Sequence, residues 1–295
     1  MKKGQSRFER YVGIDYSGAK TADDPLPGLR VYLAAGECEP REVLPVTGSR
    51  QCWSRRGLAL WLEAILDAGE PTIVGIDHVF SFPDEYFRRH GLPRDWDAFL
   101  ADFCSHWPTD RPGVRVDAVR RGACGYHAKR SGESHWRRMA DFAARGAKSA
   151  FHFDVPGSVA KSTHAGLPWL RHIRCRCGSR VHFWPFDGWH VPAGKHMIAE
   201  VFPSLWRQRY PAKERTPHQR DAFVACKWLQ DADRSGKLGG YLVPNLPSEV
   251  AARAKYEGWI LGITRYERQD VHFPPGAVET ASRRSFFPRR ISAPF

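Results

Sequence analysis

The tetrapeptide VGID occurs twice in the chain, at residues 12–15 and 74–77, and each copy ends an apolar run with an aspartate. The second run, TIVGID, is typical of a strand in the middle of a sheet that is covered on both faces. An ionised carboxylate that is buried without a partner is costly, so each aspartate needs a basic side chain, a helix N-cap or a metal ion to compensate it. The repeat therefore predicts two strands that each finish with a compensated carboxylate.

The order of the predicted elements is that of an α/β fold. Strands at 11–16, 29–36 and 41–46 precede an amphipathic helix, which Ser54 can cap and Gly69 can end, and the strand at 72–77 follows that helix. The later predicted elements are helices at 84–91, 96–107 and 133–146, a small hairpin at 171–183, a strand at 196–203, and a helix that starts with a capping box at Thr216, Pro217 and Gln219.

The length of 295 residues and the hydrophobic content of 42% predict a globular chain with a full core. We expect one domain over 1–265, followed by a basic, Pro-rich tail at 266–295. Its core would comprise 11–83 and 196–262, separated by a mostly helical, Arg-rich insertion at 84–195. No apolar run has membrane-spanning length and no signal peptide is evident, so we expect a cytoplasmic protein without a membrane partner. The seven irregularly spaced cysteines are expected to be mostly reduced thiols.

The chain carries a formal net charge of +13, with 45 lysines and arginines against 32 acidic residues. Such an excess favours a polyanionic partner, most simply DNA or RNA. An arginine-rich composition that only supplies solvated surfaces would give the same count. The charge alone leaves both interpretations open.

Four carboxylates lie at or near the ends of predicted strands and helices. Asp15 and Asp77 end strands, Glu200 ends the strand at 196–203, and Asp221 lies one turn into the last long helix. Strand ends at one edge of an α/β sheet converge on a crevice, where a cluster of like charges needs cations to be stable. Acidic oxygens suit Mg²⁺ or Mn²⁺, and two such ions about 3.5–4 Å apart promote attack on a phosphodiester.

This arrangement resembles the ribonuclease H-like superfamily, and more narrowly a bacterial branch of unknown function that is predicted to consist of ribonuclease H-like nucleases. The resemblance rests on GID at the first and fourth strands, on EVFPS after the later strand and on HQRDA in the last helix, and it covers 11–83 and 196–262. It implies a twisted mixed sheet flanked by helices and a two-metal site in which Asp15 bridges both ions. One departure is that ribonucleases H carry their second acid on the first helix, where Glu63 is the only candidate.

Each of the four carboxylates also has a structural alternative. Asp15 could order the turn that follows it, Asp77 could cap a strand end, Glu200 could pair with an arginine such as Arg207, and Asp221 could favour the helix dipole. His218 precedes Asp221 by three residues on the same helix face and could relay a proton or contact phosphate. The loop residues Ser17 and Lys20 could contact the scissile phosphate.

The segment 120–176 combines arginines with aromatic residues, as single-strand binders do. We expect it to border the carboxylate crevice, with Arg130, Arg137 and Arg138 contacting nucleic acid. A possible zinc set in the same region does not have the CxxC spacing that structural zinc sites prefer, so zinc is not favoured there. That set is His172, Cys175, Cys177 and His182.

The sequence therefore predicts a metal-dependent nuclease with Mg²⁺ or Mn²⁺ as its cofactor. One alternative is a nucleic-acid-binding or scaffold protein on an inactive nuclease fold. Another is an ATP-using enzyme of the actin-like kinase fold, because GIDYSG also resembles a phosphate-gripping turn. Such kinases need a second Gly-rich turn after a strand, and the nearest candidate, KLGGYLVP at 237–244, does not follow a strand.

Overall fold

The computed structural model describes residues 6–45, 52–124, 130–155 and 157–267. It shows an α/β fold with a mixed six-stranded sheet in the order β3-β2-β1-β4-β6-β5. The pairs β1–β2 and β2–β3 are antiparallel, whereas β1–β4, β4–β6 and β6–β5 are parallel. The strands are β1 (Arg10–Asp15), β2 (Arg30–Ala35), β3 (Arg41–Glu42), β4 (Thr72–Asp77), β5 (Val181–Trp184) and β6 (His196–Glu200).

Two of the long helices begin at the predicted caps. The Ser54 side chain accepts a hydrogen bond from the Gly57 amide, and Thr216 and Gln219 form both bonds of a capping box. The helices are α1 (Arg55–Asp67), α2 (Asp84–His90), α3 (Trp96–His106), α4 (Val116–Arg120), α5 (Met139–Ala143), α6 (Ala160–Cys177), α7 (Pro217–Arg234), α8 (Leu238–Leu242) and α9 (Ser248–Glu257).

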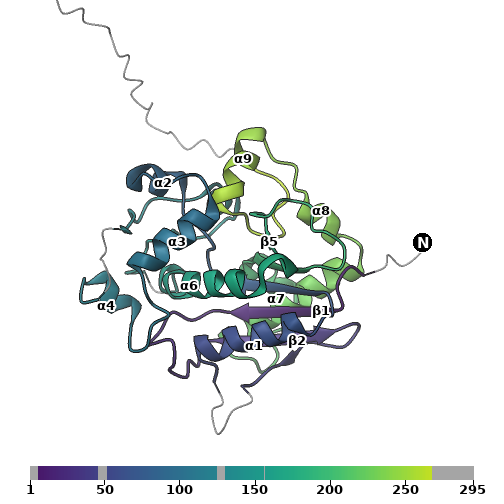
Figure 1. The fold of residues 1–295 in the computed structure, drawn as a ribbon. Coiled ribbons are helices and arrows are strands. Elements are labelled where there is room, and N and C mark those ends of the chain that lie inside the picture. Colours follow the sequence, from purple (N-terminus) through teal and green to yellow (C-terminus); the bar gives the residue numbers. More distant parts are fainter. Residues whose placement is uncertain (1–5, 46–51, 125–129, 156, 268–295) are drawn as a thin grey trace, which may run out of the picture.

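Each face of the sheet has its own hydrophobic core, because successive side chains of a strand point to opposite faces. Val12 and Ile14 pack in the core that includes residues of α1 and α6, whereas Tyr11 packs in the core that includes residues of α7. Figure 1 shows α1 and α6 in front of the sheet and α7 behind it. In this alternation, Gly13 and Asp15 share the α7 face with Tyr11.

Glycine is required in the first VGID because α7 crosses β1 in direct contact. A Cβ atom at Gly13 would lie 2.2 Å from the Ala222 carbonyl oxygen and 2.3 Å from the Cys226 amide nitrogen. At Gly75, its neighbour on β4, a Cβ would meet the side chains of Val201 and Leu229 instead. The absence of side chains at these positions brings α7 close to the ends of both strands.

Residues 84–195 differ in part from the prediction. The predicted hairpin at 171–183 is wrong, because α6 continues to Cys177 and the chain then enters β5, which joins the sheet parallel to β6. The predicted helix at 133–146 is helical only over Met139–Ala143. Since α6 packs on α1 and β5 pairs with β6, this segment supplies part of the sheet and its cover instead of lying outside the core.

The tail at 268–295, like Tyr126 and Lys129 of the basic segment, lies outside the described residues. Among the helices of the described part of the chain, none combines the length and apolar character needed to cross a membrane.

Candidate active site

Asp15 and Asp77 are direct neighbours at the carboxyl ends of β1 and β4. The two strands run parallel and pair Asp15 with Asp77, two residues beyond the Gly13–Gly75 pair. Residues paired in this way point to the same face, so both carboxylates lie on the α7 side of the sheet. They line a cleft of about 500 Å³ together with Glu200, His218 and Asp221. The sequence prediction that the four carboxylates approach one crevice therefore agrees with the structure.

Asp15 is buried and bonded to a histidine of α7. Only 8% of the residue is exposed, and the His218 Nδ1 atom donates a hydrogen bond of 2.7 Å to one carboxylate oxygen. Burial raises the pKa of Asp15 to about 6, and the bond from His218 opposes this rise. The same bond raises the pKa of His218. The bond therefore favours the protonated form of His218, which lies on the helix face that sequence spacing predicted.

Asp221 has an arginine partner. Arg207 donates from Nε to Oδ1 over 2.8 Å and from Nη2 to Oδ2, which occupies both carboxylate oxygens. Arg207 lies in the short 3₁₀ turn Arg207–Arg209 between β6 and α7 and also lines the cleft. The bidentate pair compensates Asp221 without a metal ion.

Asp77 is the exception in this cluster. Within the described residues, no side chain or backbone group donates a hydrogen bond to its carboxylate and no ion pair reaches it. Burial, followed by the charges of Asp15, Asp221 and Glu200, raises the pKa of Asp77 well above its usual range. Asp77 is only partly buried and lines the cleft, so a cation that enters the cleft would compensate this charge.

Glu200 belongs to a different network. It aligns with Ile76 on β4 and not with Asp77, so strand alternation directs it away from the α7 face. Arg138, only 1% exposed, donates to both Glu200 oxygens at 2.7 and 2.6 Å and also pairs with Asp141. The predicted arginine partner therefore exists, but it is Arg138 instead of Arg207. Because Arg138 and the Phe80 amide already donate to its two oxygens, Glu200 offers no carboxylate oxygen without a partner to a metal ion.

The fit of this site to a divalent cation rests on the two neighbouring aspartates. Among the described residues, no group of three or more His, Cys, Asp or Glu side chains has an arrangement that could hold a metal ion. Asp77 is nevertheless an unpartnered carboxylate beside Asp15, which uses one oxygen for His218. These two groups fit a hard cation, and Asp221 could join them only by leaving Arg207.

The loop after Asp15 is held in place by Arg55, the first residue of α1. The buried Arg55 donates to the backbone carbonyls of Ser17, Ala19 and Lys20. Ser17 and Lys20 thus stand on a fixed loop next to the site, without lining the cleft itself. Glu63, the one acid available on the first helix, pairs with His172 and Arg176 of α6 and lies outside the cleft.

Most cations predicted to bind nucleic acid are engaged inside the protein. Arg130 forms two bonds of 2.8 Å with Asp102, Arg137 donates to the Asp141 and Ala147 carbonyls, and Arg138 is buried on Glu200. The segment does border the cleft through 146–148 and 157–159, as predicted. Lys148 is the cation that lines it from this segment, among the described residues. Trp169 is buried in the core, and Trp136 is partly buried against it.

The four residues considered for zinc are spread over α6 and β5. His172 pairs with Glu63, and His182 Nε2 lies 2.9 Å from the Gly188 carbonyl oxygen. Cys175 is exposed, whereas Cys177 is buried.

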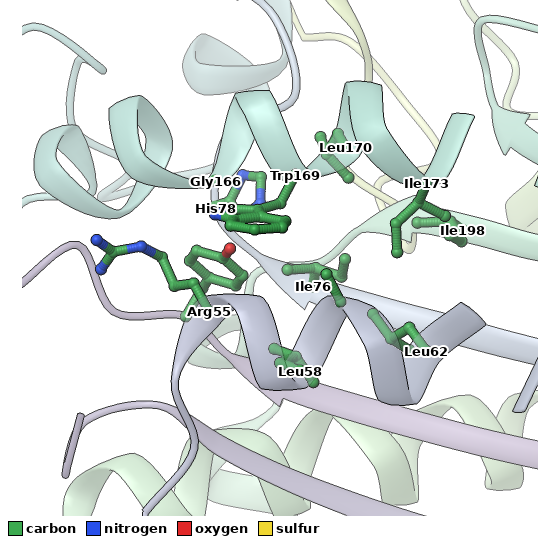
Figure 2. Close-up of a pocket in the computed structure, with 12 residues that line it drawn as sticks. Arg55, Leu58, Leu62, Ile76, His78, Gly166, Trp169, Leu170, Ile173 and Ile198 are labelled. Atoms are coloured by element: carbon green, nitrogen blue, oxygen red, sulfur yellow. The ribbon is translucent and has the colours of Figure 1, made fainter. Parts of the chain in front are cut away.

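The residues that directly follow the two aspartates point to the opposite face of the sheet. Tyr16 and His78 line a cavity of about 20 Å³ between α1 and α6, and Figure 2 shows His78 beside Gly166 and Trp169. Burial lowers the pKa of His78 to about 4, so its ring is neutral. Polar atoms at this cavity without a partner among the described residues are the Tyr16 hydroxyl, Arg55 Nε, His78 Nε2 and Trp169 Nε1. The cavity has room for one water molecule, whereas the cleft at the carboxyl ends of the strands, which Tyr16 and His78 also line, has room for a substrate.

Comparison of the chain with family models, with curated proteins and with solved structures gives no match.

Proposed function

We propose that this protein is a metal-dependent nuclease of the ribonuclease H-like type. The observation that carries the proposal is the in-register pair of Asp15 and Asp77, in which Asp77 has no partner among the described residues. The mixed sheet and the order of its elements are compatible with that fold. The excess of positive charge is compatible with a nucleic acid substrate, either DNA or RNA.

In this proposal, Asp15 and Asp77 would hold Mg²⁺ or Mn²⁺, and Asp221 could contribute a further carboxylate to the site. The bound ions would supply an activated water and charge neutralisation for hydrolysis of a phosphodiester. His218 fixes one oxygen of Asp15 and leaves the other for the cation. The His218 side chain is 59% exposed and lines the cleft, where a phosphate could contact it.

The two alternative functions have less support. A kinase of the actin-like fold needs a second phosphate turn, but residues 238–242 form α8 and a Cβ at Gly239 or Gly240 would meet open space. A binding protein on an inactive nuclease fold would have no need for two adjacent aspartates whose like charges repel each other. That alternative is an outcome of the experiment below.

The test is a cleavage assay on labelled single-stranded and duplex DNA and RNA with Mg²⁺, Mn²⁺ or EDTA. We expect cleavage that depends on the divalent ion and is lost in Asp15→Asn and Asp77→Asn. The matched control is Asp67→Asn, since Asp67 ends α1 at the opposite edge of the sheet and should leave cleavage unchanged. Binding without cleavage in the wild type would favour the inactive-fold alternative. Cleavage that persists in EDTA would overturn the metal mechanism.

A further inference from the structure

Arg207 is placed to act on the whole aspartate cluster. Its guanidinium holds Asp221 through two hydrogen bonds, and 41% of its side chain is exposed. Its backbone is fixed independently, because Arg220 donates to the Arg207 carbonyl over 2.9 Å. The side chain can therefore swing while its attachment point stays in place.

The charge of Arg207 reaches beyond its direct partner. Asp15 and Asp77 both experience its positive charge, and the three aspartates together raise the pKa of Arg207. No other arginine pairs with Asp15, Asp77 or Asp221 in the described part of the chain. Arg207 thus provides the compensation that a cluster of like charges otherwise obtains from metal ions.

A guanidinium and a divalent cation compete for the same oxygens. Because Arg207 occupies both oxygens of Asp221, this carboxylate can bind a cation only after at least one of these bonds breaks. The guanidinium that is released remains in the cleft, since it is tethered there by its backbone. Its planar fork of donors matches a phosphate as well as it matches a carboxylate.

We propose that Arg207 is an exchangeable counter-ion: it holds Asp221 in the metal-free protein, releases it when a divalent cation enters, and then binds a phosphate of the nucleic acid. The inference rests on the proposed function, because it assumes the cation and the substrate. It adds a positioning residue that makes binding of the cation and binding of the phosphate mutually favourable.

The first experiment measures Mn²⁺ affinity by titration calorimetry in the absence of nucleic acid. Arg207→Met should bind Mn²⁺ more tightly than the wild type, by about two- to tenfold, because no guanidinium has to be displaced. Arg207→Lys, which keeps the charge but loses the two-point contact, should lie between them. Arg209→Met is the matched control, because Arg209 is exposed on the same turn and should leave the affinity unchanged.

The second experiment measures binding of a short single-stranded oligonucleotide with Ca²⁺ in place of Mn²⁺. Arg207→Met should bind it more weakly than the wild type, and the slope of log affinity against log salt should fall by about 0.7, the value for one phosphate contact. The opposite signs of the two effects distinguish this role from general damage. Thermal melts of Arg207→Met, Arg207→Lys and Arg209→Met report whether these variants fold.

Three results would overturn the inference. Equal Mn²⁺ affinity in the wild type and Arg207→Met would show that Arg207 does not compete with the cation, while the proposed nuclease function would stand. Weaker Mn²⁺ binding in Arg207→Met would show that Arg207 organises the site instead. If neither protein binds Mn²⁺, the metal site fails and the inference fails with it.

Discussion

Glu200 aligns with Ile76 across the β4–β6 pair, one residue before Asp77. A shift of one residue moves a side chain to the other face of a sheet. Asp77 consequently joins Asp15 on the face covered by α7, whereas Glu200 turns towards Arg138. Two acids that end adjacent strands therefore have different surroundings: Asp77 lines the cleft without an ion-pair partner among the described residues, whereas Glu200 is paired with Arg138.

Removal of Arg138 should destabilise the protein strongly. Arg138→Met leaves Glu200 and Asp141 buried without their cation, which costs about 3–5 kcal/mol of unfolding free energy. The double variant Arg138→Met with Glu200→Gln should recover part of this loss, because the uncompensated charge at Glu200 is removed. Urea denaturation of the three proteins measures both effects. A fully stable Arg138→Met would contradict the assignment of Glu200 to a structural ion pair.

Asp77→Asn should stabilise the metal-free protein. The substitution keeps the shape of the side chain and removes an unpartnered charge beside Asp15, for a gain of the order of 1–2 kcal/mol. The same variant should lose the rise in melting temperature that millimolar Mn²⁺ gives the wild type, since it lacks a ligand. Thermal melts with and without Mn²⁺ check both points, with Asp67→Asn as the control. An unfolded Asp77→Asn would instead show that the carboxylate is needed for folding.

The contribution of Asp15 to the stability of the metal-free protein should fall as the pH rises from about 4 to about 6. The pKa of Asp15 is raised from 3.8 to about 6, so within this window the folded state keeps a proton that the unfolded chain has released. The folded state then binds more protons than the unfolded chain. The contribution of Asp15 to the free energy of unfolding therefore decreases with pH, by about 2–3 kcal/mol. Asp15→Asn should flatten the profile in this window. Denaturation midpoints of the wild type and Asp15→Asn, measured at several pH values in EDTA, test this. Parallel pH profiles for the two proteins would contradict a raised pKa of Asp15.

Gly13→Ala should be much more damaging than Gly75→Ala. At Gly13 the added methyl group meets the backbone of α7 at 2.2 Å, whereas at Gly75 it meets side-chain methyl groups of Val201 and Leu229 at 2.8 Å or more. We expect a loss above about 4 kcal/mol for Gly13→Ala and a smaller one for Gly75→Ala. Gly239→Ala on α8 meets open space and should be neutral or slightly stabilising. Similar melting temperatures for Gly13→Ala and the wild type would refute the close contact between α7 and β1.

The sequence carried the information for the α/β class and for the neighbouring aspartates, because local patterns determine both. The capping residues Ser54 and Thr216 mark helix starts, and the identical VGID segments place Asp15 and Asp77 at equal depth on paired strands. The position of Glu200 was not predictable to the same degree, since the register of β6 depends on contacts made across the fold.

The misassigned region around α6 has a physical reason. Pro168 cannot donate a backbone hydrogen bond within a helix, so the sequence of α6 disfavours an uninterrupted 18-residue helix. Gly166 is also a weak helix former, yet a Cβ there would lie 2.5 Å from His78 Nε2, and tertiary packing therefore requires glycine. The partners Arg138 and Arg207 had no local signal, because Arg138 reaches Glu200 from 62 residues away.

The contact between α7 and β1 also determines when this protein can fold during its synthesis. His218 and Asp15 are separated by 203 residues, and β1 packs directly on the helix that carries His218. A ribosome that adds about 5–20 residues per second needs roughly 10–40 s to synthesise the chain between these two residues. Throughout this interval the face of β1 that carries Tyr11 has no α7 to pack against. The cleft lined by Asp15, His218 and Asp221 can form only when α7 has left the ribosome.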